Sequence, residues 1–227
     1  MHLPDISGAV HDVAHTVKPK LRGWLHAGTF PLAVASGIVI VLLAPTAKAK
    51  IASAIFAVTA ALLFGVSALY HRGHWSPRAL AVLRRLDHAN IFLIIAGTYT
   101  PFTLLLLDRP SAQLLLTLVW AGALVGVAFR VLWLGAPRWL YVPVYVALGW
   151  AAAFWLPAFF SRGNAAIATM IVVGGLLYSA GAIIYATKKP NPSPRWFGFH
   201  EVFHACTIAA FIVHYVGISL TVYTFAA

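Results

Sequence analysis

Long apolar runs separated by short polar breaks account for nearly all of the chain beyond residue 24. Each run is long enough to cross a bilayer, which takes roughly 20 residues in a helix. None shows the ten-residue alternating pattern of a membrane-spanning strand. Backbone in hydrocarbon must satisfy its own hydrogen bonds, so these runs predict helices. The seven predicted spans are Leu25–Ala44, Ile51–Tyr70, Leu86–Leu107, Leu114–Trp133, Trp139–Phe160, Ala165–Thr187 and Phe199–Phe225.

The composition supports a membrane protein. Of 227 residues, 61% are hydrophobic and 9% are charged, whereas a soluble domain has about 45–50% apolar and ~25% charged residues. We therefore predict an all-α, polytopic fold: a seven-helix transmembrane domain at 25–227, after a cytoplasmic arm at 1–24. The arm is polar and lacks the pattern of a cleaved signal peptide. The single cysteine, Cys206, excludes an intrachain disulfide.

The positive charges predict an orientation rather than a nucleic-acid partner. The net charge is +11, yet the 16 Lys and Arg residues lie mainly in short segments between the apolar runs, not in one basic patch. With the N-terminus inside, twelve of them fall on the cytoplasmic side. The four on the outer side are Lys48, Lys50, Arg109 and Arg162. The positive-inside rule therefore predicts a cytoplasmic N-terminus and an outer C-terminus.

This topology brings several titratable side chains to the cytoplasmic end of the bundle. His71 ends the second span, Asp87 begins the third, and His200 and His204 begin the seventh. His200 and His204 are spaced i and i+4, so both imidazoles lie on one helix face, ~6 Å apart along the axis. Ser67 lies one turn deeper than His71 on the same face.

Three histidines and one open position are typical of a catalytic zinc site, because structural zinc is usually closed by four protein ligands. We therefore predict Zn²⁺ on His71, His200 and His204. Asp87 is the candidate catalytic carboxylate: it orients the water at the fourth position or acts as its general base, in preference to binding the ion directly. Ser67 is the candidate residue that positions a carbonyl. In the alternative interpretation, each histidine is an interfacial residue that hydrogen-bonds to lipid headgroups. Asp87 would then be no more than the ion-pair partner of Arg84 or Arg85.

Other polar residues near these helices have competing interpretations. His88 could replace Asp87 as the inward group, or it could face headgroups or support the metal ligands from outside. Glu201 is expected to pair with a loop cation, and Cys206 to be a small buried group on the opposite helix face. His214 lies ~15 Å deeper than His204, as a cavity wall or a satisfied core histidine. The histidines without metal spacing are His2, His11, His15, His26 and the loop residue His74.

Four stretches, in order along the chain, resemble the hemolysin III family, which belongs with the progestin and adipoQ receptors and, more distantly, the alkaline ceramidases. The stretches are Ser67-Ala-Leu-Tyr-His71, Leu86-Asp87-His88-Ala-Asn90-Ile-Phe, Gly97-Thr-Tyr-Thr-Pro101-Phe and Phe197-Gly-Phe-His200-Glu-Val-Phe-His204. The resemblance implies zinc on the three histidines, with Asp87 and Ser67 lining the site. It also implies seven helices with a cytoplasmic N-terminus.

Two functions from different classes follow. The first is a zinc-dependent hydrolase that cleaves an amide or ester bond of a membrane lipid. The second is a receptor-like or homeostatic protein with structural zinc. A pore is disfavoured because the spans lack mid-depth charges. The expected partners are membrane lipids, including a lipid substrate, with no nucleic acid and no oligomeric state predicted. The expected location is a bacterial inner membrane.

Overall fold

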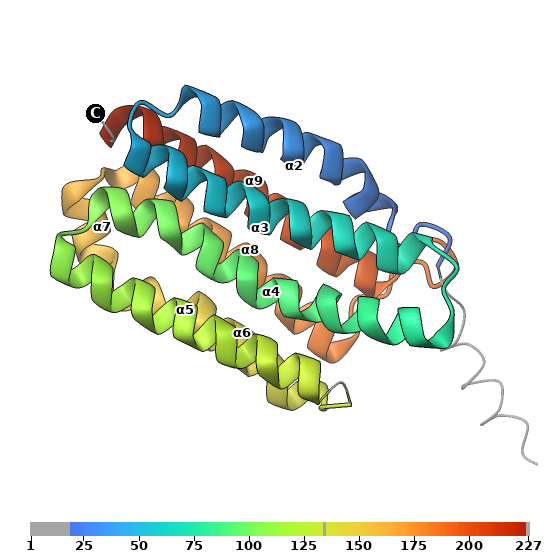
Figure 1. Ribbon diagram of the computed structural model, residues 1–227. Coiled ribbons are helices and arrows are strands. Elements are labelled where there is room, and N and C mark those ends of the chain that lie inside the picture. Colours follow the sequence, from blue (N-terminus) through green and yellow to red (C-terminus); the bar gives the residue numbers. More distant parts are fainter. Residues whose placement is uncertain (1–18, 134, 226–227) are drawn as a thin grey trace, which may run out of the picture.

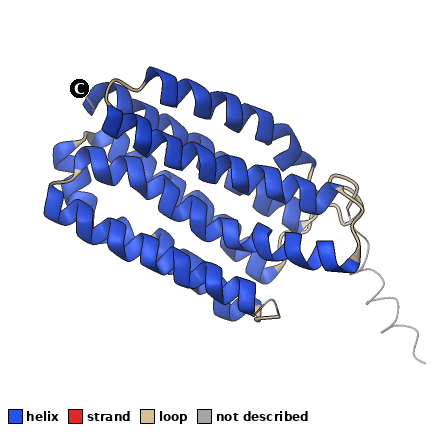
Figure 2. Cartoon of the chain, in the orientation of Figure 1, coloured by secondary structure: helices blue, strands red, loops and turns tan. Residues whose placement is uncertain are grey.

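The computed structural model describes residues 19–133 and 135–225 (Figure 1). Within them it contains seven helical spans long and apolar enough to cross a membrane, which confirms the predicted all-α, seven-helix fold. Figure 2 shows helices joined by loops. Most of the predicted arm, residues 1–18, lies outside the described residues. The helices are α2 (Trp24–Leu43), α3 (Ala47–Arg72), α4 (Pro77–Leu106), α5 (Arg109–Leu132), α6 (Arg138–Gly149), η1 (Ala151–Trp155), α7 (Leu156–Arg162), α8 (Ala165–Thr187) and α9 (Phe199–Phe225).

Several helices extend beyond the apolar runs that predicted them. The third span begins at Pro77 rather than at residue 86. Polar first turns form helix because a side chain preceding the helix accepts a hydrogen bond from an early backbone N–H. These capping side chains belong to Thr46, Ser76, Asp108 and Asn164. The N–H of Ser111 donates to the exposed Asp108 carboxylate and lowers its pKa.

Helix α4 occupies the centre of the bundle. It packs against α3 and α5 on either side, and it also contacts α6, α7 and α9. In Figure 1, α3, α4 and α5 run side by side in front of α9, α8 and α6. Helix α9 packs most extensively on α8 and also reaches α2, α3 and α4. Residues on α2, α3, α4 and α9 are thereby brought together at one end of the bundle.

The predicted fifth span is not one continuous helix. It consists of α6, the 3₁₀ turn η1 and α7. Tyr99 of α4 inserts at the break: its hydroxyl donates to the Gly149 carbonyl at 2.7 Å and accepts from the Ala152 N–H at 2.8 Å. A side chain that enters the i to i−4 ladder is an established cause of helix distortion. The apolar pattern could not reveal this interruption, because it depends on a residue from another helix.

Gly97 and Pro101 lie inside α4, which stays continuous to Leu106. The Thr100 hydroxyl donates to the Ala96 carbonyl at 2.8 Å, the i to i−4 bond that a threonine side chain makes to its own helix. Gly97 itself permits close packing, because a Cβ at this position would collide with Thr59 of α3. This agrees with the general role of small residues in membrane helix contacts.

Candidate metal centre

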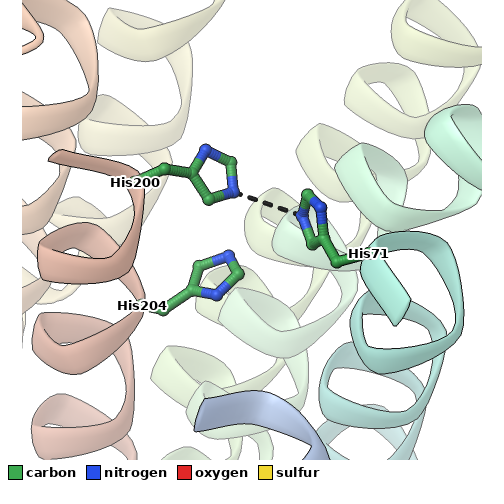
Figure 3. Close-up of side chains that lie close together, drawn as sticks. All are labelled: His71, His200 and His204. Atoms are coloured by element: carbon green, nitrogen blue, oxygen red, sulfur yellow. Dashed lines mark hydrogen bonds between the residues drawn. The ribbon is translucent and has the colours of Figure 1, made fainter. Parts of the chain in front are cut away.

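Three histidines from two helices converge at one end of the bundle. His71 lies in the last turn of α3, and His200 and His204 lie in the first two turns of α9 (Figure 3). One ligand nitrogen from each lies within 4.8 Å of the other two. The Nε2 atoms of His71 and His200 are 3.2 Å apart. The three residues predicted from sequence are therefore close neighbours, and His71 and His204 are buried.

The donor set fits a zinc ion. Two nitrogens bound tetrahedrally at ~2.0–2.1 Å from zinc would be separated by about 3.3 Å. The His71–His200 separation of 3.2 Å matches this value, and all three donor atoms lie within 4.8 Å of one another. Three imidazoles leave a tetrahedral ion with one position for another ligand. The triad thus has the donor type and the close grouping that a three-histidine metal centre needs.

Local hydrogen bonding holds the start of α9, and so its two histidines, in place. The Glu201 carboxylate accepts from the Gly198 N–H at 2.8 Å, in the manner of the third-position carboxylate of a capping box. Its other oxygen pairs with Arg22, which precedes α2. The Glu201 side chain has 0% exposure. The sequence-based interpretation of Glu201 as the partner of a loop cation is therefore confirmed.

The N-terminal segment, residues 19–23, packs against this centre. Besides the Arg22 pair, the Lys20 N–H donates to the Arg195 carbonyl at 2.9 Å in the loop before α9. Gly23 has a positive φ of 80° and lies against His71. A Cβ added to this glycine would lie only 2.6 Å from the Cβ of His71. A side chain there would be strained and would also displace a candidate ligand.

His26 is a neighbour of the centre that the sequence analysis missed. It lies in the first turn of α2 and is 2% exposed. Its ring stacks on His204, with centroids 3.7 Å apart and planes 9° apart. A single histidine at the start of an apolar run has no spacing that identifies it as part of a site. Only the packing of α2 on α9 reveals the contact.

A cavity adjoins the histidines, and Asp87 and Ser67 both line it. Among the described residues Asp87 forms no ion pair, so the alternative pairing with Arg84 or Arg85 is absent. The Ser67 hydroxyl lies beside the Asp87 carboxyl, but its geometry is too loose for a full hydrogen bond. The Asp87 carboxylate therefore remains available to a group in the cavity.

His88 is buried rather than exposed to headgroups, so that alternative is wrong. Its Nδ1 lies 2.6 Å from Nη2 of Arg130, and its carbonyl accepts from the Tyr145 hydroxyl at 3.2 Å. Arg130 is fully buried, with its guanidinium 4.1 Å from the centre of the Tyr141 ring. His88 belongs to an Arg–Tyr network beside the cavity and is not among the grouped metal donors.

Two other candidates lie away from the triad. His214 lines the same cavity and its Nε2 lies 3.3 Å from the Ile171 carbonyl, so it is both a cavity wall and a hydrogen-bonded core residue. Cys206 is half-buried rather than buried, and it packs near Gly181 of α8. The remaining cavity wall is mainly apolar and aromatic, and includes Ile95, Phe102 and Phe159. Such a lining suits a hydrocarbon chain.

Comparisons with known proteins give one consistent result. A family model described as "Haemolysin-III related" matches residues 14–215. The chain is similar to "Hemolysin-3" of Bacillus cereus, at 32% identity over 63% of this chain and 65% of that protein. It is also similar to "Hemolysin-3 homolog" of Bacillus subtilis (strain 168), at 34% identity over 64% of this chain and 68% of that protein. A shorter match, 38% identical over 72 residues, covers 28% of this chain and 16% of the "Adiponectin receptor protein" of Drosophila melanogaster.

Proposed function

This chain belongs to the hemolysin III family, as a seven-helix integral membrane protein, and we propose that it is a zinc-dependent hydrolase of a lipid amide or ester. One observation carries the proposal: a three-histidine donor set opens onto an apolar cavity that Asp87 also lines. The aligned segment covers 65% of the first bacterial relative. The three histidines and the cavity beside them support the hydrolase hypothesis, and the names of these relatives do not enter it.

Each polar residue of the site has a distinct role in this reaction. Zinc held by His71, His200 and His204 would polarise the substrate carbonyl and lower the pKa of a bound water toward ~7. Asp87 accepts the proton of the attacking water as its oxygen bonds to the carbonyl carbon. Asp87 then returns this proton to the leaving nitrogen or oxygen as the bond from that atom to the carbonyl carbon breaks.

Ser67 and the apolar wall orient the substrate. Ser67 lies one turn from His71 and lines the cavity beside Asp87, so its hydroxyl can donate to the substrate carbonyl. The acyl chain packs along Ile95, Phe102 and Phe159. This burial of hydrocarbon aligns the scissile bond with the donor set, and such alignment supplies a large part of a catalytic rate.

Replacing Asp87 by asparagine tests the hydrolase directly. The variant is expected to fold, to retain its metal and to lose turnover by about 10²–10⁴-fold, since asparagine cannot accept the proton. Purified chain is loaded with zinc and mixed with N-acyl and O-acyl lipids in detergent micelles, and the released fatty acid is quantified by mass spectrometry. Asp108→Asn is the matched control, because Asp108 caps α5 far from the triad in sequence and lies in an exposed turn.

Two results would overturn the hydrolase. One is a zinc-loaded wild-type chain that releases no fatty acid from any lipid in the panel. The other is an Asp87→Asn variant with full turnover. Either would favour the second candidate, a receptor-like or homeostatic protein, in which the ion acts by joining α3 to α9 through His71 and His204. The Drosophila relative is named as a receptor protein, which is consistent with that class.

We further propose that the metal centre faces the cytoplasm in a bacterial inner membrane. The Lys and Arg distribution supports this, with twelve of 16 on the side of the N-terminus. A cysteine-reactive, membrane-impermeant reagent applied to intact cells tests it in a Cys206→Ala background. A cysteine introduced at Lys50 is expected to react and one at His74 to be protected. The reverse pattern would invert the orientation.

A further inference from the structure

His26 contacts the triad but has no part in the hydrolase mechanism. Its ring lies parallel to that of His204, and the edge of Phe64 packs against it, with centroids 5.1 Å apart and planes at 84°. His26 also lines the cavity shared with Asp87 and Ser67. The imidazole is therefore enclosed between an aromatic ring and a candidate ligand.

Both ring nitrogens of His26 are buried without a hydrogen-bond partner among the described residues. Leaving a buried polar group unpaired costs about 1–3 kcal/mol, and such groups are rare in native proteins. Phenylalanine would fill a stacked, apolar position of this kind without that cost. We therefore expect a small ligand held at the site to supply the missing partner.

The stack also defines what His26 can contact. Parallel rings 3.7 Å apart place the His26 nitrogens one ring thickness away from the plane of His204. This offset is too long for a zinc–nitrogen bond of ~2.0–2.1 Å, and the grouped donors include only His71, His200 and His204. The same offset is compatible with a hydrogen bond of ~2.9 Å from a His26 nitrogen to an oxygen that is bound to the ion and faces His26.

The beginning of α2 is held firmly enough to fix this contact. Arg22 pairs with the buried Glu201 of α9, and Gly23 packs on His71. Trp24 stacks under the Arg72 guanidinium, 3.9 Å from the ring centre. These contacts precede His26 by one turn or less and join α2 to both helices that carry the triad. A hydrogen-bond donor placed by so many contacts is preorganised.

We propose that His26 is a positioning residue of the metal centre: it holds the plane of the His204 ring by stacking and donates a hydrogen bond to the oxygen ligand at the fourth coordination position. This role rests on the proposed metal centre. His26 would be a fourth histidine of the centre, contributed by α2. It would contact the oxygen ligand at the fourth position but not the ion itself.

Cobalt substitution separates the two parts of this role. The full chain in detergent is stripped with a chelator and titrated with Co²⁺, and then with azide as the added fourth ligand, while the visible absorption is recorded. His26→Phe keeps the stack and removes the donor. It is expected to bind cobalt within about threefold of wild type, but azide about tenfold more weakly.

Three comparisons complete the design. His26→Ala removes stack and donor, so cobalt affinity is also expected to fall, by about 10–100-fold, as for other changes around metal ligands. His26→Gln keeps a donor and loses the stack, so it is expected to bind cobalt more weakly than wild type. This variant is used in place of His26→Phe if the His26→Phe chain elutes as an aggregate. His74→Phe, the same substitution at an exposed loop position, is the control and should match wild type.

The outcomes distinguish this role from the metal centre itself. Cobalt binding with unchanged azide affinity in His26→Phe would overturn the role of His26 and leave the centre intact. A wild-type chain that takes up no cobalt would overturn the centre, and the role of His26 would fall with it. The result that the proposal predicts is a loss of azide affinity in His26→Phe while its cobalt affinity stays close to that of wild type.

Discussion

Replacing His204 by alanine is expected to lower the affinity of the chain for zinc by more than about 100-fold. Changes to residues that only orient metal ligands already cost about 10–100-fold, and His204 is one of three grouped donors. The variant also loses the ring on which His26 stacks. Competition against a chromophoric chelator measures the affinity, with the protein held in one detergent throughout.

Cys206→Ala is the matched control for His204→Ala. Cys206 lies two residues further along α9, is half-buried and is absent from the grouped donors. Its replacement is expected to leave the zinc affinity unchanged. Retention of wild-type affinity in His204→Ala, or an equal loss in both variants, would contradict a site built on the three histidines.

Breaking the ion pair between Arg22 and Glu201 is expected to destabilise the fold by about 3–5 kcal/mol, the usual cost of removing one partner of a buried pair. Arg22→Met removes the charge and keeps much of the side-chain length. Glu201, with 0% exposure, would retain only the N–H of Gly198 as a described partner. Denaturation in mixed micelles, followed by circular dichroism, measures the free energy of unfolding.

Two further variants show whether the loss arises from the stranded carboxylate. Arg22→Met combined with Glu201→Gln is expected to recover most of the stability, because the glutamine side chain is neutral. Lys20→Met removes an exposed neighbouring cation that lies over the Trp196 ring at 4.2 Å, and it should cost less than about 1 kcal/mol. Equal losses in Arg22→Met and Lys20→Met would argue against the buried pair.

Hydropathy was sufficient to predict the seven spans, because each must cover a bilayer with self-bonded backbone. It failed at features that depend on tertiary contacts or on capping. The polar first turn of α4, led by Ser76, extends the helix outside the apolar run. The break between α6 and α7 forms around Tyr99, a residue of a different helix. No pattern within the fifth span could have located it.

The triad was predictable for a different reason. The i, i+4 spacing of His200 and His204 fixes their shared face, and alternating span direction places His71 at the same end. His26 could not be placed in this way, because it is a single histidine in an apolar run and no second histidine lies three or four residues from it. Its contact with His204 depends on the rotation of α2 against α9, which single-chain periodicity does not determine. The partner of Glu201 was predictable only as a loop cation, and the fold identifies it as Arg22.

We propose that His71, His200 and His204 together hold one zinc ion, which keeps a fourth, exchangeable position. X-ray absorption at the zinc edge, on chain purified without added metal, tests it most directly. We expect one zinc per chain, with three imidazole nitrogens at ~2.0–2.1 Å and one further light ligand. A chain that holds no stoichiometric zinc, or whose zinc spectrum is unchanged when all three histidines are replaced by alanine, would contradict it.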